Sequence, residues 1–191
     1  MRIAILGWGS LLWEGGLEFD SWHGPWEFDG PTLKLEFSRV SEKRLKALTL
    51  VIDADHGVKT AVAWCVSKRA TLADAICDLR AREATTLENI GRATIAPESK
   101  PLNSDVPEGA IVAWARTKNL EAVIWTALKS NFQEKTRQSF SVSAVLSHLK
   151  TLTPEGKVKA AEYIWRAPEF VKTPVRTALQ KEPWFSEAGN S

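Results

Sequence analysis

The sequence has few of the residues that cross-link a chain or anchor it in a membrane. It contains two cysteines, one tyrosine and one methionine among 191 residues. Two cysteines cannot form a disulfide framework, and the apolar run at residues 3–6 is too short for a signal peptide. No apolar run approaches the roughly 18 residues of a transmembrane helix. We therefore expect a reduced, cytoplasmic protein that does not interact with membranes.

Excess charge is also missing. The chain has 25 Lys and Arg against 23 Asp and Glu, a formal net charge of +2, with hydrophobic residues at 44% and charged residues at 25%. This balance is typical of a globular protein and argues against disorder. Without a basic run or a strongly positive field, we expect no nucleic-acid partner.

Tryptophan, by contrast, is abundant. Nine tryptophans stand against one tyrosine, and Trp8, Trp13, Trp22 and Trp26 all lie near the N-terminus. Each indole has a large apolar surface and one N–H group that needs an acceptor when it is buried. We expect this N-terminal group to line a pocket.

Strand patterns dominate the first two thirds of the chain, and helix patterns dominate the last third. Residues 32–40 alternate between apolar and polar side chains, which is typical of a half-buried strand. Thr71 and Asp74 form a helix-start signal. Residues 121–128 are apolar and fit either a strand or a helix. The other expected strands are 2–6, 47–52, 59–66 (joined to 47–52 by a hairpin loop at 53–57) and 110–116, and the other expected helices are 141–151 and 155–167.

This order of elements predicts an α+β fold. We expect a core domain over residues 1–117 and a mainly helical extension over 118–191 that packs on it. The 14–31 and 96–109 segments have loop compositions. The apolar face of the 141–151 helix predicts packing in the core or at an interface, which allows a homodimer.

A glycine turn follows the first expected strand. Residues 6–13 read LGWGSLLW, and the glycines allow positive φ angles and close approach of the backbone. Backbone N–H groups that converge in such a turn can bind a carboxylate or phosphate. Leu12 stands where a dinucleotide fingerprint needs its third glycine, so that reading is excluded. A turn with a purely structural role remains the alternative.

Glu83 is a second candidate. The expected helix from Leu72 has apolar residues at Ile76, Leu79 and Leu87, and Glu83 falls on the same face if the helix is continuous. A buried carboxylate suits general acid–base chemistry. The alternatives are an ion pair with Arg80 or Arg82, or a helix break at Ala84 that returns Glu83 to solvent.

Other candidates for chemistry are weaker. Cys65 and Cys77 are expected to be buried apolar side chains. His56 lies beside Asp53 and Asp55 in a loop, where such residues are usually solvated and seldom bind a metal. We therefore expect no metal site.

Together, the glycine turn and Glu83 resemble the γ-glutamylcyclotransferase-like superfamily. That family has a Tyr-Gly-Ser loop after its first strand, extended to Tyr-Gly-Ser-Leu-Ile-Trp in ChaC-type members. Its catalytic glutamate lies after the barrel strands, near an Arg-Glu or Glu-Gly element. Residues 6–13 and the Arg82-Glu83 pair are similar to these motifs. The resemblance covers residues 2–116 and implies a γ-glutamylcyclotransferase-like mixed β-barrel with flanking helices.

The resemblance also implies a reaction. In that family the α-amino group of a γ-glutamyl amide attacks the γ-carbonyl carbon and releases 5-oxoproline and a free amine or amino acid. The small-molecule substrate would be glutathione or another γ-glutamyl compound, and neither a metal nor a cofactor is implied. Glu83 would carry the proton between the two nitrogens. The residues implied in substrate binding are Gly7, Trp8, Gly9, Ser10 and Leu11.

One position departs from the family. Trp8 stands where the family has tyrosine, and an indole donates one hydrogen bond but accepts none. This difference bears on which substrate the protein would bind more than on which fold it adopts. It leaves a second hypothesis, a non-catalytic protein on the same fold that binds γ-glutamyl compounds or small carboxylates.

Overall fold

The computed structural model describes residues 1–96 and 106–185, and it shows an α+β protein with two β-sheets. The chain divides into two compact units. Unit 1 consists of Met1–Leu33 and Lys59–Leu128, and unit 2 consists of Lys34–Val58 and Lys129–Ser191. Both units are discontinuous in sequence, so this division does not coincide with the boundary expected after residue 117.

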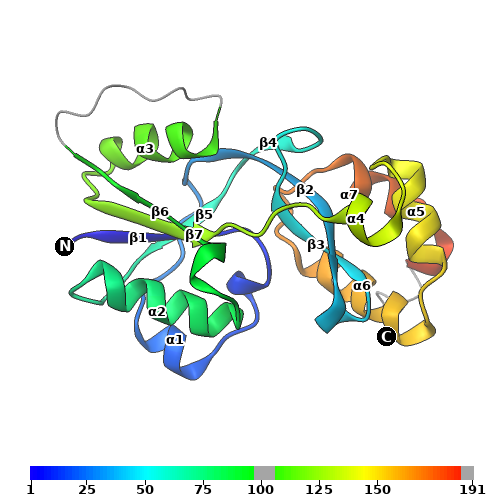
Figure 1. Cartoon of the computed structure of the whole chain (residues 1–191), viewed down its shortest axis with the longest axis horizontal. Helices are drawn as coiled ribbons and strands as arrows, with labels where there is room; N and C mark the ends of the chain where they lie inside the picture. The colour runs from blue at the N-terminus through cyan, green and yellow to red at the C-terminus, as the bar shows by residue number, and fades with distance from the viewer. Residues whose placement is uncertain (97–105, 186–191) are drawn as a thin grey trace. The chain divides into compact units, whose positions relative to one another are not determined.

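Unit 1 is built on a four-stranded sheet with the order β5-β1-β7-β6. β1 pairs antiparallel with β5 and parallel with β7, and β6 pairs antiparallel with β7. Helices α1 and α2 lie against one face of this sheet and α3 against the other (Figure 1). The bounds are β1 Ile3–Gly7, β5 Ala63–Val66, β6 Ile90–Thr94, β7 Ala122–Thr126, α1 Leu17–Ser21, α2 Leu72–Glu83 and α3 Pro107–Thr117.

The core of unit 1 fills the space between the sheet and α2. Ile5 and Ile124 on neighbouring strands pack with Leu79 of α2, and all three are fully or almost fully buried. Burial of each such side chain contributes about 1.5–3 kcal/mol. This core fixes the end of β1 and the end of α2, the two places where the sequence predicts chemistry.

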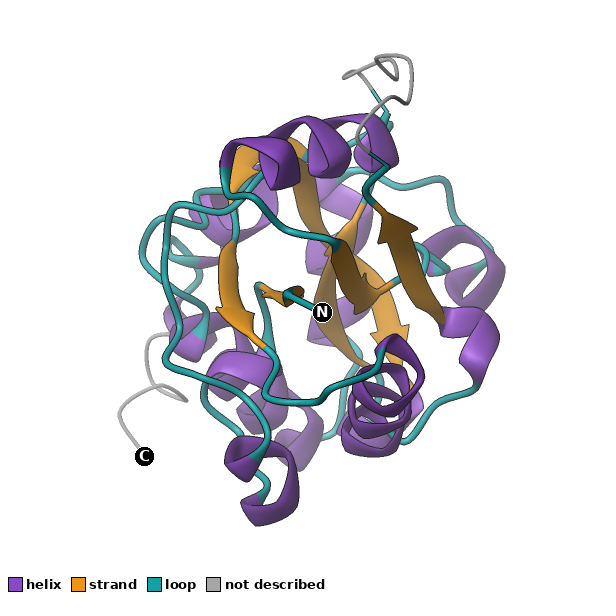
Figure 2. Ribbon diagram, turned by 90° about the vertical axis from the view of Figure 1, so that its left-hand side faces the viewer, coloured by secondary structure: helices purple, strands orange, loops and turns teal. Residues whose placement is uncertain are grey.

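Unit 2 combines the antiparallel pair of β2 and β3 with helices. Figure 2 draws the strands of the whole chain in orange and its helices in purple. Phe37 of β2 lies opposite Leu50 of β3, and a register shift follows Phe37. The three-stranded sheet has the order β3-β2-β4. The bounds are β2 Thr32–Ser41, β3 Ala47–Ile52, α4 Phe132–Thr136, α5 Val142–Lys150, α6 Pro154–Arg166 and α7 Pro174–Leu179. Strand β4 (Val58–Ala61) lies in unit 1 except for Val58, and β2 begins in unit 1 at Thr32.

Several predicted elements are confirmed. The strands expected at 2–6, 32–40 and 47–52 correspond to β1, β2 and β3, and the ambiguous 121–128 segment contains strand β7. The helices expected at 141–151 and 155–167 correspond to α5 and α6. The start of α2 is confirmed in detail, because the Thr71 side chain accepts a hydrogen bond from the Asp74 N–H.

The strand predicted at 110–116 is wrong, because this segment forms helix α3. Pro107 occupies the first turn, where its fixed φ angle favours a helix. Ile111, Val112 and Ala115 are buried, at helical spacings of one, three and four. A short apolar run fits a buried strand equally well, so only the packing decides between them.

The predicted hairpin is also wrong. The strand expected at 59–66 is interrupted at Val62, and its halves β4 and β5 belong to different sheets. β2 lies between β3 and β4, so β3 and β4 are not paired. The described strands form open sheets and no closed barrel.

Two further expectations need correction. The loop expected at 14–31 contains the short helix α1. The polar face of β2 is not solvated throughout, because Glu36 and Ser38 are completely buried. Part of the loop expected at 96–109 lies outside the described residues. Among the described helices, none combines the length and apolar character needed to cross a membrane.

Candidate functional site

The glycine turn leads from β1 into a short 3-10 helix, η1 (Ser10–Leu12). The Leu12 N–H donates to the Gly9 carbonyl at 2.9 Å, and the Glu14 N–H donates to the Ser10 carbonyl at 2.7 Å. Among the described residues, no backbone acceptor receives the N–H groups of Gly9, Ser10 or Leu11. These three consecutive donors can therefore bind a carboxylate or an oxyanion.

Gly7 is required by close packing and not by its backbone conformation. A Cβ at this position would lie 2.9 Å from two ring carbons of Trp26 and 3.0 Å from Cδ2 of Leu12. None of the described glycines has a positive φ angle, so the expected left-handed conformation in this turn is wrong. The absence of a side chain at Gly7 lets Trp26 lie directly against the turn.

Glu83 is the last residue of α2. The helix ends because Ala84 adopts a left-handed conformation with φ of 47°. Leu87 therefore leaves the expected apolar face and is half-exposed. The break at Ala84 does not return Glu83 to solvent, since its side chain is 17% exposed.

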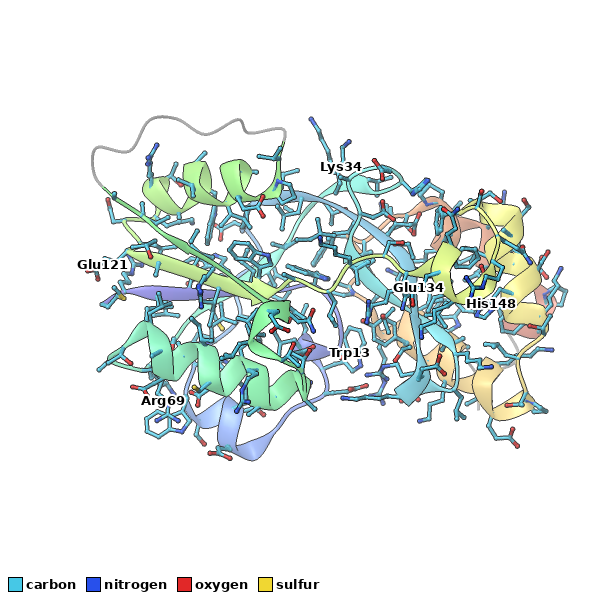
Figure 3. The ribbon with its side chains drawn as sticks, viewed as in Figure 1. Trp13, Lys34, Arg69, Glu121, Glu134 and His148 are labelled. Atoms are coloured by element: carbon cyan, nitrogen blue, oxygen red, sulfur yellow. The ribbon has the colours of Figure 1, made fainter. Side chains whose placement is uncertain are left out.

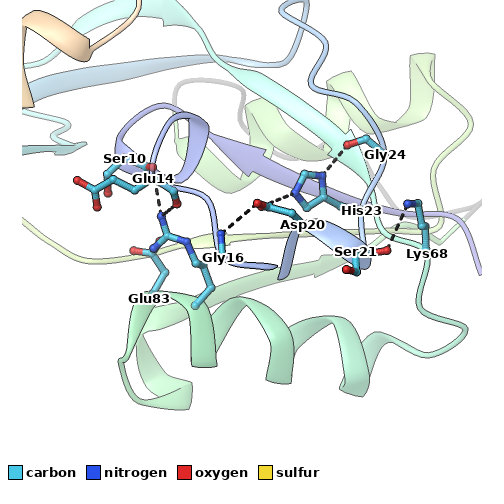
Figure 4. A network of polar contacts seen from close by, with 10 residues as sticks. Ser10, Glu14, Gly16, Asp20, Ser21, His23, Gly24, Lys68 and Glu83 are labelled. Atoms are coloured by element: carbon cyan, nitrogen blue, oxygen red, sulfur yellow. Dashed lines mark hydrogen bonds and ion pairs between the residues drawn. The ribbon is translucent and has the colours of Figure 1, made fainter. Parts of the chain in front are cut away.

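Arg82 connects Glu83 with the glycine turn. Its Nη2 atom donates to the carbonyl oxygen of Ser10 at 3.2 Å and also to the carbonyl oxygen of Glu14. Its Nη1 atom lies 3.7 Å from Oε1 of Glu83. Figure 4 shows Glu83 together with Ser10 and Glu14 of the turn. The structure thus brings the two predicted site features together within unit 1, on either side of one arginine.

The aliphatic part of Arg82 also contacts this segment. A Cβ on Gly16 would lie 3.6 Å from Cδ of Arg82, so the arginine stem runs along the chain that enters α1. The Nε atom of Arg82 is buried and has no hydrogen-bond partner among the described atoms. A buried donor without a partner is costly for folding. Such groups are most often retained at functional sites or where water is bound.

A second polar network lies beside the turn, on α1. Oδ2 of Asp20 accepts a hydrogen bond from the Gly16 N–H at 3.1 Å, and Oδ1 lies 3.4 Å from Nε2 of His23. Nδ1 of His23 lies 2.6 Å from the Gly24 carbonyl (Figure 4). This network stabilises the chain that follows η1.

Sequence reasoning recognised Arg82 only as an alternative ion-pair partner. Its position next to Glu83 indicated the ion pair, and this alternative is confirmed. The hydrogen bonds to Ser10 and Glu14 span about seventy residues, and no local pattern could have predicted them. The Asp20–His23 contact was missed as well, although its spacing of three residues is typical of contacts within a helical turn.

The N-terminal tryptophans have separate roles. Trp8 is buried, and Trp26 packs against Gly7 as described above. The ring of Trp22 lies 3.6 Å from the guanidinium carbon of Arg69, a cation–π contact. Trp64, in β5, donates its indole N–H to Asp29 at 2.8 Å. Trp26 therefore lies against the turn, and the expectation that this group lines a pocket stays a prediction.

The two cysteines differ in environment. Cys65 is buried, and burial raises the pKa of its thiol far above the usual range. It is therefore protonated and unreactive at neutral pH. Cys77 lies on α2 and is exposed, so the expectation that it is buried is wrong. Among the described residues, no group of His, Cys, Asp and Glu side chains has the arrangement of a metal site.

Comparisons with known proteins do not assign the chain to a family. No protein-family model matches it, and no curated protein sequence matches it. The functional argument therefore depends on the geometry of residues 7–16 and 80–84.

Proposed function

We propose that this protein is an enzyme that cleaves a γ-glutamyl amide and releases 5-oxoproline and a free amine or amino acid. The observation that carries the proposal is the arginine bridge described above, in which Arg82 joins the carbonyl of Ser10 to the carboxylate of Glu83. A donor-rich turn and a partly buried carboxylate are the two elements that this reaction requires.

The turn would hold the acidic part of the substrate. The N–H groups of Gly9, Ser10 and Leu11 can donate to a carboxylate or to the oxyanion that forms at the γ-carbonyl carbon. The nucleophile is the substrate's own α-amino group. The protein therefore has mainly to hold the γ-glutamyl chain in the geometry of the five-membered ring, and such positioning can supply about 7–11 kcal/mol of the barrier.

Glu83 would transfer the proton. Its carboxylate takes a proton from the α-ammonium group, which frees the nitrogen lone pair for attack, and returns the proton to the leaving nitrogen. General acid–base catalysis of this kind typically accelerates a reaction about 10²–10⁴-fold. The guanidinium of Arg82 lies 3.7 Å from Oε1 of Glu83 and helps to hold this carboxylate at the end of α2.

The γ-glutamylcyclotransferase-like fold is part of the same proposal. Its support is the order of strand β1, glycine turn and a glutamate at the end of α2. The open sheets of the described residues depart from the closed barrel of that family, and Trp8 departs from the family's tyrosine. We place the site in unit 1 alone.

The test is formation of 5-oxoproline from γ-glutamyl dipeptides, glutathione and γ-glutamylamines. Wild-type protein is expected to convert at least one of these compounds, and Glu83→Gln is expected to slow the reaction about 10²–10⁴-fold while the protein stays folded. Glu88→Gln is the matched control, because Glu88 is an exposed carboxylate five residues further along the chain. Equal activity of wild type and Glu83→Gln would refute the role of Glu83.

A second function is favoured by one observation. Trp8 is buried beside the turn, where it supplies an apolar surface in place of the family's hydroxyl group. A protein that binds γ-glutamyl compounds or small carboxylates without turnover fits this substitution. Calorimetric binding of a γ-glutamyl dipeptide that survives incubation unchanged would support this function over catalysis.

A further inference from the structure

Unit 2 contains a cavity that the proposed reaction does not use. Its volume is about 490 Å³, within the size range of small-molecule sites. The walls come from the end of β2, the turn that follows it, α4, α5 and the start of α6. All of the lining residues belong to unit 2.

The floor of the cavity is apolar. Val40 and Leu152 line it and are buried, whereas Leu45 lines it and is 51% exposed. Thr153 adds a hydroxyl group that accepts a hydrogen bond from the Gly156 N–H at 3.1 Å, and no described residue accepts the hydrogen of this hydroxyl. The cavity can therefore receive an apolar body and one polar group.

The charged groups of the cavity are mostly cationic. Lys46 and Lys135 line it together with one carboxylate, Glu42. Nζ of Lys135 lies 3.8 Å from Glu42 and 4.0 Å from Glu134, so this lysine is already neutralised in part. Within the described residues, Lys46 forms no ion pair. Lys46 is therefore the cation that remains available to a ligand.

Lys46 is held in a strained turn. Leu45 and Lys46 have φ angles of 53° and 67°, a conformation that costs L-residues free energy and that glycine or asparagine would adopt more easily. The surrounding structure enforces it. The ring of His148, labelled in Figure 3, donates through Nε2 to the Lys46 carbonyl at 2.9 Å, and a Cβ on Gly156 would lie 3.1 Å from the Leu45 carbonyl. Strain that is held by surrounding contacts is concentrated at functional sites.

We propose that this cavity binds a small organic anion. Its carboxylate or phosphate group pairs with the ammonium group of Lys46, and its apolar part packs on Val40 and Leu152. A lysine and a leucine are retained in the strained turn because their side chains contact this ligand. The proposal is independent of the reaction in unit 1.

The experiment measures binding of model anions to the full chain by NMR or calorimetry. Benzoate and phenyl phosphate are the organic probes, and they distinguish a carboxylate from a phosphate head group. Inorganic phosphate is the control for the apolar part, because it is an anion without a ring. Benzylamine is the control for the sign of the charge, because it has the ring but is a cation. Tighter binding of benzoate or phenyl phosphate than of both controls supports the proposal, and equal binding of either control overturns it.

Three variants locate the binding. Lys46→Gln is expected to weaken binding of the organic anion about tenfold, as loss of a charged hydrogen-bond partner does. Lys159→Gln, on α6 outside the cavity, is the control and is expected to bind as wild type does. Lys46→Gly relieves the strained φ angle, so it is expected to raise the melting temperature by about 2–4 °C while it weakens binding.

The glycine variant separates a ligand role from a structural one. If Lys46→Gly gains stability and keeps wild-type affinity, the strained turn has no function in binding and the proposal fails. The proposal also fails if none of the probes binds the wild-type protein at millimolar concentration. Neither result bears on 5-oxoproline formation, because that reaction is assigned to unit 1.

Discussion

The guanidinium of Arg82 donates a hydrogen bond of 3.2 Å to the carbonyl oxygen of Ser10, although the two residues are 72 positions apart in the sequence. This bond links the end of α2 to the turn after β1. Since Arg82 also lies beside Glu83, one side chain sets the distance between the two parts of the proposed site.

The first prediction concerns this bridge. Arg82→Gln is expected to lower the free energy of unfolding by about 1.5–3 kcal/mol, because it removes charged hydrogen bonds to two carbonyl groups. It is also expected to reduce 5-oxoproline formation, with partial recovery in Arg82→Lys. Urea denaturation and the activity assay measure the two effects. Arg80→Gln is the control, because it removes the same charge from an exposed position of the same helix. If Arg80→Gln lost as much stability and activity as Arg82→Gln, the bridge would be contradicted.

The second prediction concerns packing at the glycine turn. Gly7→Ala is expected to cost about 1–3 kcal/mol, because its Cβ would lie within 3.0 Å of Trp26 and Leu12. Gly24→Ala is the matched control, since its nearest atom, the Val66 carbonyl oxygen, would be 3.7 Å from the new Cβ. Thermal unfolding of both variants tests the difference. Equal melting temperatures would show that Trp26 moves aside freely.

The third prediction concerns Glu36 and pH. Burial raises the pKa of this carboxyl, although the Thr173 side chain and the N–H groups of Phe37 and Val175 oppose the effect. The folded state therefore keeps its proton at a pH where the unfolded state has lost it. The free energy of unfolding is expected to fall as pH rises from the unfolded-state pKa to the raised folded-state pKa.

Glu36→Gln isolates this contribution. The amide oxygen can still accept a hydrogen bond, but the residue no longer titrates, so the stability of the variant relative to wild type is expected to grow with pH. Urea denaturation between pH 4 and pH 8 measures it. If the free energies of unfolding of the variant and of wild type differed by the same amount at every pH in this range, the raised pKa of Glu36 would be contradicted.

A neighbouring carboxyl predicts the opposite slope. Burial alone would raise the pKa of Asp53, but the nearby Ser38 hydroxyl and the N–H groups of His56 and Asp55 outweigh it and lower the pKa. Asp53 therefore contributes stability that is present above the unfolded-state pKa and is lost as pH falls through the folded-state pKa. In urea denaturation at several pH values, the free energy of unfolding of Asp53→Asn is therefore expected to fall less than that of wild type as the pH is lowered.

The fourth prediction concerns the start of α2. Thr71→Ala is expected to cost about 0.5–2 kcal/mol, because it removes the side-chain acceptor of the Asp74 N–H. Thr71→Ser keeps that acceptor and is expected to retain most of the stability. Since Thr71 and Glu83 flank opposite ends of the helix, the activity of folded Thr71→Ala protein should match wild type. A selective loss of activity would indicate coupling along α2.

Local signals predicted some features well. The N-cap at Thr71 was predictable because its side chain contacts a residue three positions along the chain. The short buried strand β1 was predictable because it is an apolar run that ends at a glycine. The strand predicted at 110–116 was wrong because a short apolar run satisfies a buried helix and a buried strand equally well. The split of 59–66 into β4 and β5 depends on pairing with distant strands, which no local pattern contains.

The candidate site was predicted only in part. The turn at Gly7–Leu11 and the carboxylate of Glu83 were found from the sequence, but the expected reason for the burial of Glu83 was wrong. Glu83 is not on a continuous apolar face, because α2 ends at Ala84. It is partly buried at the end of α2, beside the guanidinium of Arg82.

The sequence by itself determined the α+β composition, the glycine turn after the first strand, the start of α2 and the scarcity of cross-linking residues. These depend on residue type and short-range spacing. Only the tertiary structure decided that Arg82 joins Ser10 to Glu83, that Gly7 admits a tryptophan ring and that Lys46 is strained beside a cavity. Each of these depends on contacts between residues far apart in the chain, and such contacts are set by the packing of whole elements, which local propensity does not specify.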